Sequence, residues 1–85
     1  MADQDRRRAI DEALKLYAQK AREGMDFTDG PCLSEEVIPD WCVDIAHSPR
    51  QRSDNWPRNQ CQSYRRGKVH HFVELDKYGN LIRAE

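Results

Sequence analysis

The stretch from Val69 to Ala84, VHHFVELDKYGNLIRA, decides the class of fold that we expect for this chain. Over residues 69–75 one set of alternate positions is mostly apolar, which is the period of a β-strand with one buried face. Residues 76–80, DKYGN, supply turn chemistry in which Gly79 can take a positive φ, and residues 81–84 return as a second strand. The C-terminus is therefore predicted to be a β-hairpin.

A third strand is expected over Val37–His47, upstream of the hairpin. Trp41, Val43 and Ile45 alternate there with Cys, Asp and Ala, as in a sheet that buries one face. Pro39 has no N–H to donate, so the beginning of this strand is expected to be irregular or to lie at an edge of the sheet.

The segments around this strand carry mainly turn and loop signals. Residues 25–36 include the sequence Asp29-Gly30-Pro31, so we expect a connection without a regular element there. Residues 48–56 are polar and are expected to form a loop. A short helix is expected over residues 57–66, because proline is tolerated at the first helical position and Gly67 can end the helix.

An amphipathic helix is expected over Asp5–Glu23, with residues 1–4 frayed. Asp3 or Asp5 can cap its first turn, and Gly24 favours a left-handed stop. Apolar residues recur at three- and four-residue spacing and fall on one side of a helical wheel. The residues expected to face the core are Ile10, Ala13, Leu14, Tyr17, Ala18 and Ala21.

Together these elements predict a single α+β domain over residues 1–85. A long N-terminal amphipathic helix packs on a three-stranded, mostly antiparallel sheet, and a short helix precedes the C-terminal β-hairpin. A chain of 85 residues has material for one modest core.

Composition restricts the compartment and the partners that we expect. Only 38% of the residues are hydrophobic and 34% are charged, and no run approaches the roughly 18 apolar residues of a membrane helix. No apolar segment of a secretory signal follows the charged first residues. The three cysteines are an odd number without CxxC spacing, which fits free thiols in a reducing compartment. We therefore expect a cytoplasmic protein with no membrane partner.

Charge is segregated along the chain although the net charge is −1. Residues 23–46 carry seven acids and no base, and residues 47–73 carry six bases against one acid. Either the two stretches pair with each other across the fold, where an exposed ion pair contributes only about 0–1 kcal/mol, or one stretch faces a partner.

The middle of the chain is the place where we expect a binding surface. We expect a small interaction module that binds a protein partner or a second copy of itself, because one helix leaves the second face of such a sheet poorly covered. Cys42, Phe72 and Ile82 are candidates for that face. The residues predicted to bind are Arg50, Arg52, Trp56, Arg65, Arg66 and His70.

Two other binding functions stay open. Residues 50–71 interleave arginines with aromatic residues, a combination that can grip phosphates and stack on the bases of single-stranded RNA. A small zinc site is the other alternative, with Cys32 and Cys61 joined by a histidine, although the closely spaced ligand pairs of zinc fingers are missing.

No catalytic motif is present in the sequence. P-loop, GxGxxG, HExxH and GxSxG patterns are all missing, and a chain of this size has little material for both a core and a desolvated pocket. We therefore expect no enzymatic activity, no catalytic residue and no cofactor.

Overall fold

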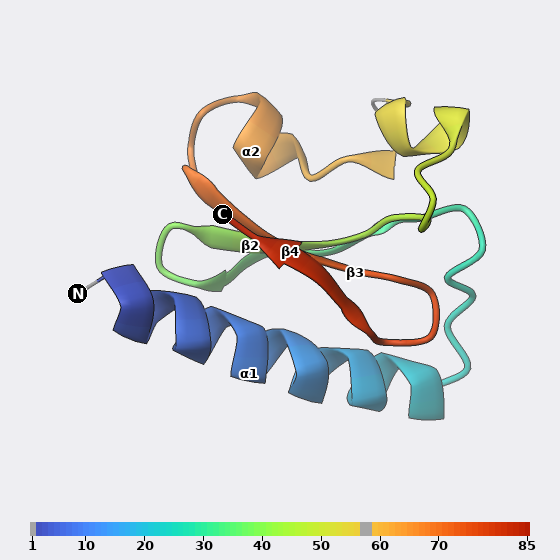
Figure 1. The fold of residues 1–85 in the computed structure, drawn as a ribbon, viewed down its shortest axis with the longest axis horizontal. Helices are drawn as coiled ribbons and strands as arrows, with labels where there is room; N and C mark the ends of the chain where they lie inside the picture. Colours follow the sequence, from blue (N-terminus) through green and yellow to red (C-terminus); the bar gives the residue numbers. More distant parts are fainter. Residues whose placement is uncertain (1, 57–58) are drawn as a thin grey trace.

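A computed structural model describes residues 2–56 and 59–85 of the chain. Helix α1 (Ala2–Arg22) lies along one face of a four-stranded sheet, and the segment that carries the short helices η1 (Arg52–Asn55) and α2 (Gln62–Arg65) lies on the other face (Figure 1). The α+β class and the long N-terminal helix are confirmed. No helix in the described ranges has the length and apolar character needed to cross a bilayer.

The sheet has the order β1-β2-β3-β4 and is mixed. Its strands are β1 (Cys32–Ile38), β2 (Trp41–Ile45), β3 (His71–Leu75) and β4 (Leu81–Ala84). The β1–β2 and β3–β4 pairs are antiparallel, whereas β2 and β3 are parallel and run in register. The prediction of three mostly antiparallel strands is therefore wrong in strand number and in one pairing, while the C-terminal hairpin is confirmed.

Strand β1 lies mostly in the segment that was predicted to be an irregular connection. Two register irregularities interrupt its pairing with β2, one between Cys32 and Ser34 and one between Ser34 and Ile38. The exposed pair Glu35 and Glu36 lies in the same stretch. The bulges break the period-2 pattern, and this edge strand therefore lacks the alternation by which a strand is recognised.

A tight turn divides the single strand that was predicted over residues 37–47. Ile38 pairs with Trp41, so the loop consists of Pro39 and Asp40 alone, and Asp40 has a φ of 74°. Proline presets the first turn position, and aspartate is one of the few residues other than glycine that tolerate a left-handed conformation. Pro39 thus marks a hairpin turn rather than an irregular strand end.

The parallel pairing of β2 with β3 requires a crossover between them. The described residues of this connection, 46–56 and 59–70, lie over the face opposite α1 (Figure 1). The predicted loop over residues 48–56 contains η1, and the predicted helix over residues 57–66 is reduced to α2. The first two residues predicted for that helix, Pro57 and Arg58, lie outside the described residues.

Helix α1 presents a narrower and slightly rotated face to the sheet than its pattern predicted. Ala9 and Ala13 are fully buried, and Leu16 packs beside them. Leu14, predicted to face the core, is 39% exposed, and Ala18 and Ala21 are exposed too. Two alanines at the closest approach let the helix lie near the strands.

The main core lies between α1 and the sheet. Trp41, Val43 and Ile45 of β2 are buried there, as their alternation predicted. A second apolar cluster lies on the opposite face, where Cys42, Cys61 and Val69 are buried together with the partly buried Cys32 and Phe72. Strand β2 is therefore covered on both faces, as is usual for a strand that pairs in parallel.

Tyr17 of α1 contacts the turn of the C-terminal hairpin. Its ring stacks on Phe27 with a centroid separation of 4.6 Å, and its hydroxyl donates to the carbonyl of Lys77 at 2.7 Å. A Cβ at Gly79, where φ is +86°, would lie 2.5 Å from Cε1 of Tyr17. Glycine is required in this turn both by the backbone conformation and by the tyrosine ring.

The first prediction concerns this glycine. Gly79→Ala is expected to lower the free energy of unfolding by more than the roughly 1–2 kcal/mol of a left-handed non-glycine residue, because Tyr17 must also move. Gly67→Ala is the matched control, since Gly67 has a φ of +73° but no atom within 4 Å of the added Cβ. Urea unfolding of both variants measures the difference, and equal losses would contradict the role of Tyr17.

Candidate functional site

A cleft lies between the sheet and the crossover on the face opposite α1. Its volume is about 190 Å³, and we call it the Asp44 cleft. The strands supply its floor, and the segment around α2 supplies one wall. The lining residues are Cys42, Asp44, Arg50, Gln60, Cys61, Tyr64, Arg65, Phe72, Glu74 and Arg83.

Two carboxyl groups stand side by side on the floor of the cleft. Asp44 of β2 and Glu74 of β3 are register partners in adjacent parallel strands, so their side chains leave the same face of the sheet. Glu74 is only 6% exposed. Arg50 donates to one of its oxygens at 3.1 Å, and Arg83 donates to the other at 2.9 Å. Both oxygens of Glu74 are therefore paired with guanidinium groups.

Asp44 differs from Glu74 at one of its two oxygens. Its Oδ1 atom is buried, and no group in residues 2–56 or 59–85 forms a hydrogen bond with it. Burial, and then the negative charge of Glu74, raise the pKa of Asp44 to about 8, while Arg50 acts in the opposite direction and Asp54 adds to the increase. Burial of a carboxylate with an unpaired oxygen disfavours its charged form, so Asp44 holds its proton to a higher pH than an ordinary aspartate does.

Asp54 organises the loop that forms one end of the cleft. It is 3% exposed, and its side chain accepts hydrogen bonds from the backbone N–H groups of His47 at 3.0 Å and Gln51 at 2.9 Å. The ring of His47 also forms a hydrogen bond with the carboxylate of Asp54. Burial acts to raise the pKa of Asp54, but these hydrogen bonds together hold it below its usual value. The backbone carbonyl of Asp54 accepts from Arg50 at 3.4 Å and from Gln60 at 3.2 Å, which places both cleft residues.

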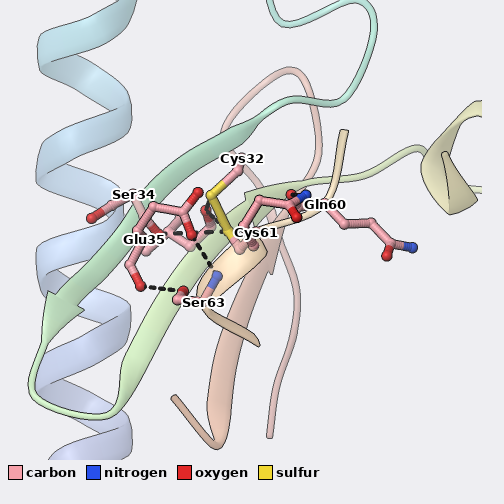
Figure 2. The surroundings of a disulfide bond; sticks show 8 residues. Cys32, Ser34, Glu35, Gln60, Cys61 and Ser63 are labelled. Atoms are coloured by element: carbon pink, nitrogen blue, oxygen red, sulfur yellow. Dashed lines mark hydrogen bonds between the residues drawn. A yellow bond between two sulfur atoms is a disulfide. The ribbon is translucent and has the colours of Figure 1, made fainter. Parts of the chain in front are cut away.

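A disulfide joins Cys32 of β1 to Cys61 at the beginning of α2 (Figure 2). The prediction of three free thiols is therefore wrong for these two cysteines. Because the crossover returns over β1, it brings positions 29 residues apart in sequence to a Cα–Cα distance of 4.9 Å, which suits a disulfide. Cys42 is free and buried, and burial raises the pKa of its thiol to about 12.

The crossover is also held to β1 by Ser63. Its backbone N–H donates to the carboxylate of Glu35 at 2.8 Å, and its hydroxyl donates to the carbonyl of Glu35 at 2.6 Å. Figure 2 shows both bonds beside the disulfide. The wall of the Asp44 cleft is therefore fixed to the edge of the sheet by one covalent bond and two hydrogen bonds.

The structure brings two of the six predicted binding residues into the cleft. Arg50 is paired with Glu74, and Arg65 donates to Gln60 at 2.9 Å near the rim. Arg66 lines a separate hollow next to Glu35. The remaining three predicted residues lie elsewhere: Arg52 is exposed in η1, Trp56 is 40% exposed, and His70 contacts Asp40 at 2.8 Å.

The predicted zinc ligands are brought together only in part. Cys32 and Cys61 meet, but the third metal-ligating side chain beside them is Glu35. The histidines contact other residues, since the ring of His47 contacts Asp54 and that of His70 contacts Asp40. No histidine of the described ranges belongs to the cluster.

The binding residues predicted from the sequence do not include Asp44, Glu74 or Arg83. Their signal was present, because Asp44 and Glu74 are single acids within the otherwise apolar or aromatic strands WCVDI and HFVEL. A charged residue inside a buried strand marks either a partner or a site. The sequence does not specify the parallel pairing of β2 with β3, which places the two acids side by side.

Comparison of the chain with protein-family models, curated proteins and solved structures gives no match.

The second prediction concerns the disulfide. Reduction is expected to lower the free energy of unfolding by about 2–4 kcal/mol, because the bond closes a long loop in the unfolded chain. Unfolding in urea with and without a phosphine reductant measures the loss. The double variant Cys32→Ala/Cys61→Ala is the control and is expected to be insensitive to the reductant. An unchanged wild type would contradict the covalent link.

The third prediction concerns the pH dependence of stability. The folded chain keeps a proton on Asp44 up to pH of about 8, whereas the ordinary pKa of this group is 3.8. The stability that this proton contributes is fully present below pH 3.8 and is lost as the pH rises through about 8. The free energy of unfolding is therefore expected to fall by up to about 1.4 kcal/mol per pH unit in that window.

Asp44→Asn removes this titration and retains the shape of the side chain. Its free energy of unfolding, measured in urea from pH 5 to pH 8, is expected to increase relative to that of the wild type as the pH rises. A constant difference between the two proteins over that range would show that Asp44 is already ionised in the folded state.

Proposed function

We propose that the protein is a non-catalytic binding module that engages a protein partner through the Asp44 cleft, into which the partner inserts a lysine or arginine side chain. The observation that carries this proposal is the buried, unpartnered Oδ1 atom of Asp44. Leaving a buried acceptor without a hydrogen bond costs about 1–3 kcal/mol. A donor group from a partner recovers this free energy.

The charges around Asp44 favour a cation. Glu74 has the largest charge effect on the pKa of Asp44, ahead of Arg50, and Asp54 adds to the effect of Glu74. The potential at Asp44 is therefore negative. Since Arg50 and Arg83 are paired with Glu74, the positive charge that Asp44 lacks is left for a partner to supply.

The walls of the cleft suit the stem of a basic side chain. Tyr64 is 44% exposed, and its ring meets that of Phe72 edge-on at a centroid distance of 5.2 Å. The guanidinium group of Arg83 already lies 5.1 Å from the centre of Phe72, which is a separation at which cations and aromatic rings attract. These surfaces can contact the methylene groups of an inserted lysine or arginine.

Size and reactivity favour a side chain over a substrate. The cleft measures about 190 Å³, below the roughly 300–1,000 Å³ of pockets for small molecules. The sulfur atoms that line it are not activated, because Cys61 is in the disulfide and the pKa of Cys42 is about 12. Both features support binding without catalysis.

The alternative of RNA binding has weaker support. The predicted cationic surface needs arginines that converge and are free, but Arg50 is paired with Glu74, and Arg65 and Arg66 line different hollows. The described part of the chain does not form a continuous basic surface from these three residues.

The fourth prediction tests the cation. In a titration of the ¹⁵N-labelled protein, peptides with one central lysine or arginine between glycine and serine residues are expected to shift the amide signals of Asp44, Tyr64 and Glu74. A peptide with a central glutamate is expected to leave them unchanged. Asp44→Asn is expected to weaken binding roughly tenfold or more, as for the loss of a charge-assisted hydrogen bond.

The matched control is Asp11→Asn on the exposed surface of α1, which is expected to bind like the wild type. Affinity for the basic peptides is expected to increase from pH 6 to pH 8, because the cation binds the ionised form of Asp44. Shifts that are the same in both variants, or an affinity that falls over this range, would falsify the proposal. Salt-sensitive binding of oligouridylate by Arg65 and Arg66 would favour RNA instead.

A further inference from the structure

Three metal-ligating side chains meet where α2 packs on β1. The Sγ atoms of Cys32 and Cys61 and a carboxylate oxygen of Glu35 all lie within 4.8 Å of one another. Figure 2 shows Glu35 beside the disulfide, with Ser63 next to it. Cys61 is buried and Cys32 is half-buried, while Glu35 is exposed, so the cluster is open to solvent at its carboxylate.

The carboxylate of Glu35 is held in place by α2. The backbone N–H of Ser63 donates to it at 2.8 Å, and the hydroxyl of Ser63 holds the carbonyl of the same residue at 2.6 Å. Bonds of this kind orient the ligands of a metal and restrict their motion before the ion arrives. Glu35 is therefore a preorganised ligand, not a freely rotating surface acid.

We propose that, when the disulfide is reduced, Cys32, Cys61 and Glu35 bind one thiophilic divalent cation, for which Zn²⁺ is the best fit. Two thiolates and one carboxylate are common ligands of zinc. Three protein ligands leave a fourth tetrahedral position, which water can fill from the exposed side of Glu35.

The chemistry balances with a dithiol as the reductant. The reductant passes two electrons and two protons to the disulfide, so that the S–S bond breaks, two thiols form on Cys32 and Cys61, and the reductant becomes a disulfide. Each thiol then loses its proton to water as it binds the ion, because the thiolate is the ligand. The same cysteines thus alternate between a disulfide and a metal site.

The Cα positions already suit both states. The Cα atoms of the two cysteines are 4.9 Å apart, and each Sγ can rotate about its Cα–Cβ bond to accept Zn–S bonds of about 2.3 Å. Cys42 belongs to the same apolar cluster but not to the group of mutually close ligand atoms. It therefore serves as an internal control.

The test uses the full chain, freed of metal and kept reduced by a phosphine. Titration with Co²⁺ is expected to give a thiolate-to-cobalt charge-transfer band and the visible absorption of tetrahedral cobalt, saturating at one ion per chain and displaced by Zn²⁺. The oxidised chain is expected to show neither band. Cys32→Ser and Cys61→Ser are expected to lose the charge-transfer intensity, whereas Cys42→Ser is expected to retain it.

A second pair of variants keeps the test independent of the folding of the cysteine variants. Glu35→Gln is expected to bind at least tenfold more weakly than Glu36→Gln, which removes the neighbouring exposed charge and keeps all three ligands. Circular dichroism is used to check that both variants are folded. A reduced wild type without the charge-transfer band, or equal affinities of the two glutamine variants, would overturn the proposal. Because Asp44 is not a ligand, Asp44→Asn is expected to bind Co²⁺ like the wild type.

Discussion

The parallel pairing of β2 with β3 is the constraint on which the rest of the structure depends. Two parallel strands cannot be joined by a hairpin, so the chain needs a crossover, and the described residues of this crossover, 46–56 and 59–70, lie over the face that α1 leaves open. This crossover covers β2 on its second face, carries Cys61 to the edge of the sheet and builds one wall of the Asp44 cleft. The register of the same pair places Asp44 next to Glu74.

Two adjacent acids on a buried face need nearby groups that neutralise their negative charge, and the fold places such groups beside Glu74. Glu74 takes both nearby guanidinium groups, so its charge is stabilised by charge-assisted hydrogen bonds. The Oδ1 atom of Asp44 has no hydrogen-bond donor among the described residues, and burial together with the charge of Glu74 raises the pKa of Asp44. Equal sharing would have left neither acid with a complete set of partners. Among the buried side-chain atoms of the described residues, this asymmetry leaves the Oδ1 atom of Asp44 without a hydrogen bond.

The parts of the fold that the sequence predicted are those specified by local pattern. Helix α1, the alternation of Trp41, Val43 and Ile45, and the C-terminal hairpin each depend on residues close together in the chain. Strand β1 could not be recognised because its bulges break that pattern. The parallel pairing and the disulfide between Cys32 and Cys61 join distant residues, and no spacing rule specifies them. The cleft was not predicted for the same reason, because the arginine-rich stretch is visible in the sequence whereas the pairing of Arg50 with Glu74 joins distant residues.

In the folded protein, the segregation of charge along the chain does not produce a simple pairing of the acidic stretch with the basic one. Arg50 from the basic stretch is neutralised by Glu74, which lies outside the acidic stretch, and Asp40 from the acidic stretch contacts His70 and His71. The ion pair of Arg50 with Glu74 holds the crossover on the sheet, and the contacts of Asp40 join the turn between β1 and β2 to the beginning of β3. Cys61 connects the cleft to the edge of the sheet, since it lines the Asp44 cleft and also forms the covalent link to β1. The wall of the cleft and the cysteine–glutamate cluster are thus two sides of one short segment, and the position of that segment is fixed by the same parallel pair of strands.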